Sequence, residues 1–297
     1  MESPIDRILA QGVDLHCHGY PELAPDGGAR LDDVELARAM RQAGLRGYVL
    51  TSHFWPTVGR AYLLAQLVPE VQVIPSITLN RLVGGFAPPV VEAAARQGAR
   101  VVFLPTWTAA HDQERGGFCR EVHRHFPQMV PWMQGHALRV VDQRGTLLPE
   151  VREILSVAKE LNLVLCTGHI APSESLAVAE ACEGVGFGRL VFSHPNSGSV
   201  GASLGEMEAM AQHGAFVEFT ALSTISIMRR TEPRQIAEWI NRIGPEHCVL
   251  SSDAFNVWAP PAPELLRMFV GQLKALGVEE AALQLMVREN PAKLLGL

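Results

Sequence analysis

The chain has 297 residues, of which 47% are hydrophobic and 19% charged, and its formal net charge is −6. A chain of this length and composition can bury a large core without disulfides or metals to hold it together. The negative charge argues against nucleic acids and anionic membranes as partners, because both demand a basic surface, and no apolar run reaches the ~18 residues of a membrane span.

The N-terminus and the cysteines both indicate a cytoplasmic protein. The first residues lack the basic region and apolar core of a secretory signal. The five cysteines are scattered, with no Cys-x-x-Cys pair, and several lie in apolar runs where a reduced thiol packs as a small hydrophobe. We therefore expect free thiols and a cytoplasmic location.

Eight short apolar runs, rich in β-branched residues, alternate with amphipathic segments. The runs are residues 13–18, 47–53, 71–79, 100–106, 163–169, 189–194, 215–220 and 248–253. Most are continuously apolar, as in strands that are buried on both faces of a parallel sheet. We therefore expect these runs to be parallel strands.

The segments between the runs carry helix start and stop signals. Asp32 and Glu35 form a capping-box pattern, and Gly44 ends the helix that follows. Ser203 and Glu206 repeat the capping pattern later in the chain. Eight strand–helix repeats predict an α/β fold, a (β/α)8 TIM barrel, with a doubly wound open sheet as the alternative.

The connection after the fourth run is unusually long. Residues 108–148 separate that run from the next helix, which is predicted to begin at Pro149. On a barrel this segment would lie over the active-site face, where long ordered loops are usually lids or binding loops. We expect one domain over residues 1–297, with this insertion as either a substrate-facing lid or a solvated helical excursion.

Titratable side chains stand at the C-terminal ends of five runs, the face on which barrel enzymes build their active sites. They are His16 and His18 in the first run, His53 in the second, His169 in the fifth, His194 in the sixth and Asp253 in the eighth, and His111 follows the fourth run. His16 and His18 point to the same side, because side chains alternate along a strand. We expect this set to converge. Glu218, inside the seventh run, could point into the barrel as a further acid or outward to a helix.

Imidazole and carboxylate groups in this combination are ligands for zinc and neighbouring transition metals. A bound metal lowers the pKa of its water from about 16 to about 7, which makes a hydroxide nucleophile at neutral pH. We therefore expect a site for one or two divalent ions, with zinc as the first expectation and manganese or iron as alternatives. Asp253 could both bind the metal and accept the proton of the water.

These residues resemble the amidohydrolase superfamily of metal-dependent hydrolases. The matching segments are Asp-Leu-His-Cys-His at 14–18, His169, His194, Ser-Ser-Asp at 251–253 and the tail Asn-Pro-Ala-Lys-Leu-Leu-Gly at 290–296. The resemblance implies that His16, His18 and Asp253 hold one metal, with Asp253 as the general acid/base. It also implies that His169 and His194 hold a second metal or contact the substrate, which makes His194 a second catalytic candidate.

One feature of many superfamily members is missing. They bridge two metals with a carboxylated lysine on the fourth strand, but the three lysines of this chain, Lys159, Lys274 and Lys293, lie elsewhere, and residues 100–106 contain no carboxylate. We therefore expect either one metal, or a second metal site that includes His53 and His111.

Several functions fit this pattern. The first is a metal-dependent hydrolase acting on an amide, cyclic amide, lactone or ester. Leu-Thr-Ser-His at 50–53 and Ser-Asp-Ala at 252–254 resemble motifs of PHP-type phosphoesterases, although Phe255 replaces their closing histidine. A decarboxylase or hydratase of the same superfamily and a non-catalytic metal-binding protein are further alternatives. In each enzymatic case we expect a small-molecule substrate, no nucleic-acid or membrane partner, and a possible homo-oligomer.

Overall fold

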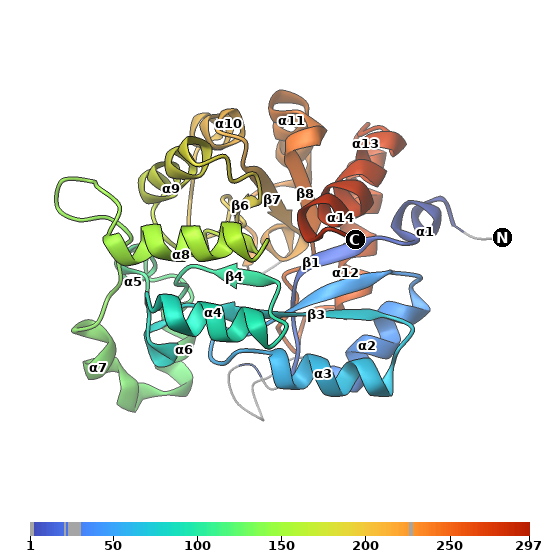
Figure 1. Ribbon diagram of the computed structural model, residues 1–297. Coiled ribbons are helices and arrows are strands. Elements are labelled where there is room, and N and C mark those ends of the chain that lie inside the picture. Colours follow the sequence, from blue (N-terminus) through green and yellow to red (C-terminus); the bar gives the residue numbers. More distant parts are fainter. Residues whose placement is uncertain (1–2, 21, 23–30, 226–227) are drawn as a thin grey trace. The chain divides into compact units, whose positions relative to one another are not determined.

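The computed structural model describes residues 3–20, 22, 31–225 and 228–297 (Figure 1). Among these residues, no helix combines the length and the apolar character needed to cross a bilayer. All five cysteines are buried, free thiols, as the sequence predicts.

Eight strands form one sheet in which each strand is hydrogen-bonded to the next in chain order. They are β1 (Val13–His18), β2 (Gly47–Thr51), β3 (Gln72–Thr78), β4 (Val101–Phe103), β5 (Val164–Cys166), β6 (Leu190–Phe192), β7 (Phe216–Thr220) and β8 (Cys248–Ser251). The first strand also meets the last, because the amide of Asp253 donates to the carbonyl of His16 (2.8 Å) and that of His18 donates to Ala254 (3.1 Å). The fold is therefore the expected (β/α)8 barrel.

Helices separate the strands, as the alternating pattern predicts. The α-helices are α1 (Pro4–Leu9), α2 (Asp33–Gln42), α3 (Val58–Leu67), α4 (Pro88–Arg96), α5 (Ala110–Arg115), α6 (Cys119–His125), α7 (Val130–Gln134), α8 (Pro149–Glu160), α9 (Pro172–Gly184), α10 (Leu204–Gln212), α11 (Pro233–Ile243), α12 (Ala262–Ala275), α13 (Glu280–Gln284) and α14 (Asn290–Leu295). The shorter turns are η1 (Arg81–Val83), η2 (Pro127–Met129), η3 (Ala221–Thr224), η5 (Pro245–His247) and the π-helical η6 (Leu285–Glu289).

The chain divides into two compact units. The first unit comprises residues 1–51, 57–75 and 218–297, and the second comprises residues 52–56 and 76–217. The boundary falls within β3 and within β7, so each unit contains part of these strands. The expectation of one domain over residues 1–297 stays a prediction.

In the first unit, β1, β2 and β8 are buried along their whole lengths. Helix α12 packs against α1, α2 and α11. The capping box expected at the start of α2 is formed, since the amide of Glu35 donates to the Asp32 side chain (2.7 Å) and the amide of Asp32 donates to that of Glu35 (3.0 Å). The sequence therefore fixes the start of α2, the helix between β1 and β2.

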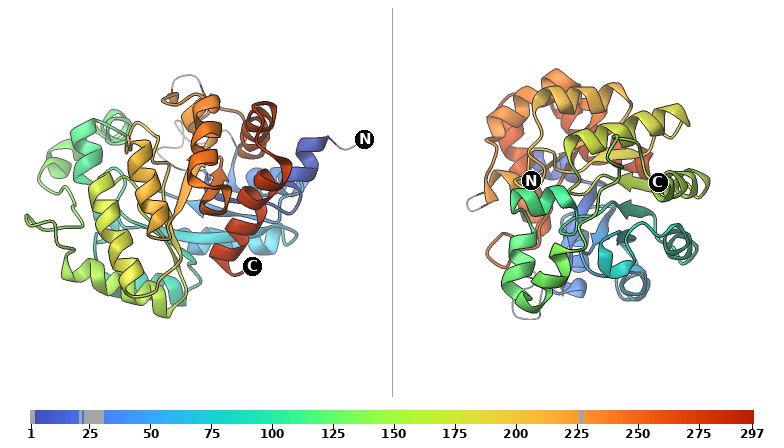
Figure 2. Two further views of the ribbon diagram at one scale, coloured as in Figure 1. Left: turned by 90° about the horizontal axis from the view of Figure 1, so that it is seen from above. Right: turned by 90° about the vertical axis from the view of Figure 1, so that its left-hand side faces the viewer.

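In the second unit, every residue of β4, β5 and β6 is buried, and Phe103, Trp107 and Phe192 are among its largest buried side chains. Helix α4 packs on α8, and α9 lies beside α10 (Figures 1 and 2). Strand β5 is shorter than the predicted run because Gly168 adopts a φ of 61°, and a Cβ there would lie 2.3 Å from the Leu104 carbonyl oxygen. The chain therefore turns just before residue 169.

The insertion over residues 108–148 is helical and contains α5, α6, η2 and α7. An isolated parallel bridge joins Ala109 to Leu138, and an antiparallel one joins Val141 to Leu147. The insertion is thus helical. Both of its expected roles, a substrate-facing lid or a solvated excursion, stay predictions.

Candidate functional site

His16, His18 and Asp253 of the first unit come together as a candidate metal-ligand group. The Nε2 atoms of His16 and His18 lie 3.6 and 3.5 Å from Oδ1 of Asp253, and one ligand atom from each of the three residues lies within 4.8 Å of the others. Two ligands bound at about 2.1 Å to one tetrahedral zinc are about 3.4 Å apart. The spacing of the group therefore fits a single ion.

A carboxylate stands behind each of these two imidazoles. Nδ1 of His16 lies 3.3 Å from Oε2 of Glu218, and Nδ1 of His18 lies 3.3 Å from Oε1 of Glu22. Metal-binding histidines usually donate their second N–H to such a partner, which keeps the other nitrogen as the ligand atom. Of the two orientations open to Glu218, the structure has the one toward His16. Sequence reasoning missed Glu22, and only its position four residues after His18 could have indicated it.

Negative charge surrounds the two imidazoles. Burial lowers the pKa of His16, but the carboxylates of Asp253 and Glu218 outweigh burial and raise it. Burial also lowers the pKa of His18, and Glu22 and Asp253 outweigh it to raise the pKa to about 9. Two imidazoles thus face three carboxylates, an arrangement that favours an added positive charge.

The backbone at this group is irregular. The pairing of β1 with β2 shifts register between Asp14 and Cys17, so His16 lies within the irregularity. Oδ1 of Asp14 accepts the amides of Ser252 (3.0 Å) and His16 (3.2 Å), and burial raises the pKa of Asp14 to about 6. Asp253 has a φ of 54°, in the left-handed region that few non-glycine residues adopt. The hydrogen bond from Ser252 to Asp14 joins β1 to the end of β8, next to His16 and Asp253.

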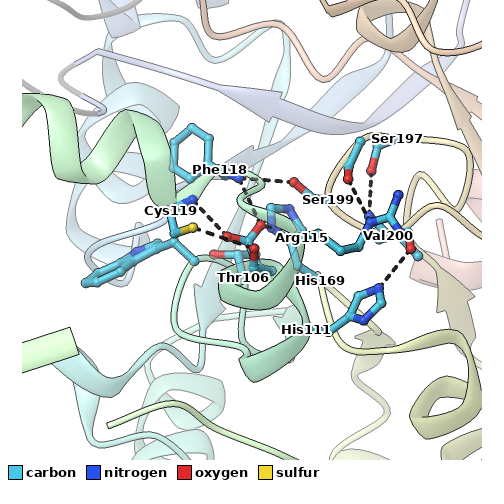
Figure 3. Close-up of polar contacts among 12 residues, drawn as sticks. Thr106, His111, Arg115, Phe118, Cys119, His169, Ser197, Ser199 and Val200 are labelled. Carbon is cyan, nitrogen blue, oxygen red and sulfur yellow. Dashed lines mark hydrogen bonds and ion pairs between the residues drawn. The ribbon is translucent and has the colours of Figure 1, made fainter. Parts of the chain in front are cut away.

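In the second unit, His169 is bound by Asp112, which belongs to α5 of the insertion. Nδ1 of His169 lies 2.8 Å from Oδ2 of Asp112, whose carboxylate also accepts the amides of Phe118 (2.9 Å) and Cys119 (2.8 Å) (Figure 3). Burial raises the pKa of Asp112, but these hydrogen bonds, with that of His169 the strongest, outweigh burial and lower it. Sequence reasoning missed Asp112, although it directly follows His111.

His53, His169 and His194 lie close together in the second unit, and we call them the histidine cluster. The ring centroids of His169 and His194 are 5.0 Å apart, and those of His53 and His169 are 6.0 Å apart. His194 has a φ of 27°, and its Nδ1 lies 3.3 Å from Oγ of Ser197. The ring of His53 lies against Phe118, at a centroid distance of 4.0 Å.

His111 ties the insertion to the loop that follows β6. Its Nε2 lies 2.9 Å from the carbonyl oxygen of Val200, and Nε of Arg115, also on α5, donates to the carbonyl of Gly198 (3.0 Å) (Figure 3). A carbonyl only accepts hydrogen bonds, so Nε2 of His111 carries the hydrogen. Only Nδ1 is therefore left for the metal-ligand role that the sequence suggests for His111.

A pocket opens beside His18 in the first unit. Its walls are mostly apolar and include Leu36, Phe255 and Pro260. Asn256 also lines the pocket, and its buried Nδ2 has no hydrogen-bond partner among the described residues. The pocket therefore offers an apolar surface and one amide donor next to a candidate metal ligand.

The sequence was compared with models of protein families and with curated proteins. The model of a family described as "Family of unknown function (DUF6282)" matches residues 11–218, more than half of the chain. No curated protein is detectably similar in sequence.

Solved structures with the same fold are similar over almost the whole chain. An amidohydrolase from Pseudomonas aeruginosa has a TM-score of 0.65 at 14% identity, with 99% of this chain and 98% of that chain covered. A probable dipeptidase from the same organism has a TM-score of 0.61 at 13% identity, with 98% and 96% covered. A mutant of an organophosphorus hydrolase from Deinococcus radiodurans has a TM-score of 0.60 at 16% identity, with 98% and 94% covered. At this level of identity the similarity establishes the barrel fold.

Proposed function

The chain belongs to the family of unknown function DUF6282, and we propose that it is a metal-dependent hydrolase. The observation that carries this proposal is the convergence of His16, His18 and Asp253, with Glu218 and Glu22 behind the two imidazoles. The same fold in an amidohydrolase, a probable dipeptidase and an organophosphorus hydrolase supports it.

His16, His18 and Asp253 would hold one divalent cation, with zinc as the first candidate and manganese or iron as alternatives. When bound, such a cation polarises the scissile carbonyl and lowers the pKa of water. A second ion is not needed for this proposal. Glu218 and Glu22 each lie 3.3 Å from one Nδ1 atom, where a carboxylate favours the hydrogen on Nδ1 and would leave both Nε2 lone pairs for the ion.

Asp253 is proposed as the general acid/base. Its side chain is 12% exposed, whereas those of His16 and His18 are 2% and 0% exposed. It is therefore the member of the group that exchanges protons with solvent most readily. Its carboxylate would accept a proton from the attacking water and return it to the leaving group.

An uncharged substrate fits the first unit better than an anionic phosphoester. The pocket beside His18 has no arginine or lysine among its lining residues. Arg60, which follows β2 and could have bound phosphate, donates to both carboxylate oxygens of Asp33 at 2.7 Å. We therefore propose a small ester, lactone, amide or cyclic amide as substrate, with its carbonyl oxygen accepting from Asn256. The cytoplasmic location and the possible homo-oligomer stay expectations.

The decisive experiment measures metal content and activity together. Protein purified without chelator should carry at least one equivalent of zinc, manganese or iron by elemental analysis. It should hydrolyse members of a panel of aryl esters, lactones and cyclic amides, but not anionic phosphoesters, and lose activity on metal removal.

Asp253→Asn should lower kcat about 10²- to 10⁴-fold, the range for loss of a general acid/base. The matched control is Glu238→Gln, because Glu238 is an exposed carboxylate of α11 in the same unit. Protein without bound metal, or an Asp253→Asn variant with the activity of the control, would refute the proposal. If the protein catalysed decarboxylation or hydration and no hydrolysis, the proposed reaction would be wrong, but the proposed metal ligands would stand.

A further inference from the structure

Two members of the histidine cluster, His53 and His169, are contacted at the same ring atom by different kinds of partner: a carboxylate, which only accepts, and a hydroxyl, which can also donate. Nδ1 of His169 contacts the carboxylate of Asp112 at 2.8 Å, and Nδ1 of His53 contacts the hydroxyl of Thr106 at 3.0 Å. In a neutral imidazole one nitrogen donates and the other accepts. The partner at Nδ1 therefore decides which group Nε2 presents.

For His169, the charge of Asp112 sets which of the two residues donates the hydrogen bond between them. Both carboxylate oxygens of Asp112 accept backbone amides, Oδ1 from Cys119 and Oδ2 from Phe118, as an ionised carboxylate does, and an ionised carboxylate can only accept. Nδ1 of His169 must therefore carry the hydrogen. The Nε2 atom of the neutral ring then has a lone pair, which suits a metal ligand or a base.

For His53, a chain of hydrogen bonds through Asn80 sets which residue donates the hydrogen bond between His53 and Thr106. Oδ1 of Asn80 accepts the amides of Thr106 (2.9 Å) and Thr108 (3.2 Å), which fixes the orientation of its side-chain amide. Nδ2 of Asn80 therefore donates, to the carbonyl of His53 (2.9 Å) and to Oγ1 of Thr106 (2.7 Å).

The Thr106 hydroxyl is buried and accepts this hydrogen bond, and Nδ1 of His53 is the acceptor that the described residues offer for its own single hydrogen. That nitrogen must then be the acceptor, so the neutral ring carries its hydrogen on Nε2. The contact with Phe118 holds the ring plane in place.

We infer that His53 and His169 are held in opposite tautomers, and that His53 acts as a hydrogen-bond donor rather than as a metal ligand. Its Nε2–H would bind an acceptor oxygen of a ligand, such as a carbonyl or carboxylate oxygen. Thr106 and Asn80 are positioning residues that set this role. The assignment of tautomers does not depend on the proposed function, which enters only where the ligand is taken to be the substrate.

Nitrogen NMR of the full-length protein with ¹⁵N-labelled histidine tests the tautomers directly. At a pH where both rings are neutral, His53 should show its protonated nitrogen at Nε2, and His169 should show it at Nδ1. Thr106→Val, which removes the hydroxyl at nearly constant volume, should shift His53 toward the Nδ1–H form, and Thr106→Ser should retain the wild-type pattern. A proton on Nδ1 of His53 in the wild type, or an unchanged tautomer in Thr106→Val, would overturn the inference.

Titration with zinc alone tests the second part. His53→Gln should bind the same number of zinc equivalents as the wild type, and loss of an equivalent would overturn the donor role. A wild-type protein that binds no zinc would refute the proposed hydrolase, but the NMR result for His53 would still decide between the tautomers.

Discussion

The metal-ligand group of the first unit and the histidine cluster of the second contain the same side chain in different surroundings. In the first unit two imidazoles face three carboxylates at 3.3 to 3.6 Å. In the second unit, one carboxylate is hydrogen-bonded to Nδ1 of His169, and a hydroxyl is hydrogen-bonded to Nδ1 of His53. The first arrangement has an excess of negative charge that a cation can balance, whereas Asp112 of the second is balanced by the N–H groups it accepts. We expect the partner at Nδ1 to decide the role of each histidine.

The largest effect should come from Asp112→Ala. The Asp112 carboxylate accepts hydrogen bonds from two amides and from His169, and hydrogen bonds to charged groups contribute about 1.5–3 kcal/mol each. We expect the free energy of unfolding in urea to fall by at least about 4.5 kcal/mol, the low end of that range for three bonds. Glu114→Ala is the control, because Glu114 is an exposed residue of the same helix and its pair with Arg139 should contribute less than about 1 kcal/mol. Equal losses in the two variants would contradict the assigned role of Asp112.

The next effect concerns the metal-ligand group itself. His18→Gln should raise the dissociation constant for zinc more than about 100-fold, since removal of a ligand should exceed the effect of removing a partner behind it. Competition with a chromophoric chelator measures this constant. His247→Gln, in η5 of the same unit, should bind zinc as the wild type does. A dissociation constant for zinc equal to that of the wild type would show that His18 of the first unit does not bind the metal.

A smaller loss is expected when only the partner of His16 changes. Glu218→Gln should weaken zinc binding about 10- to 100-fold, because the neutral amide stabilises the Nδ1–H group less than the carboxylate does. Glu238→Gln again serves as control. If Glu218→Gln bound zinc as the wild type does, the surplus of carboxylates that distinguishes the first unit would not contribute to metal binding.

The smallest effect tests the residue behind Glu218. The hydroxyl of Ser251 donates to Oε1 of Glu218 at 2.5 Å and so orients the carboxylate that faces His16. Ser251→Ala should weaken zinc binding about fivefold, equivalent to about 1 kcal/mol for one hydrogen bond. Ser156→Ala, at an exposed position of α8, should leave the constant unchanged. A loss as large as that of Glu218→Gln would mean that Ser251 acts on more than this carboxylate.

Much of the fold could be predicted because its signals are local. The alternation of apolar runs and amphipathic segments gave the strand order, and the capping pattern at Ser203 and Glu206 reappears as a hydrogen-bonded box at the start of α10. Strand ends were predicted less well. The predicted run 163–169 extends past β5, but the close approach of Gly168 to Leu104 ends the strand at Cys166. That approach involves two segments far apart in sequence.

The sequence by itself determined that histidines and one aspartate stand at the ends of barrel strands, since strand position follows from local hydrophobic patterning. Only the tertiary structure decided what faces them. Glu218, 202 residues from His16, and Asp112, 57 residues from His169, meet their histidines because the fold brings distant strand ends and loops together. The hydrogen-bond directions that separate His53 from His169 are set by such long-range partners, and no spacing in the sequence encodes them.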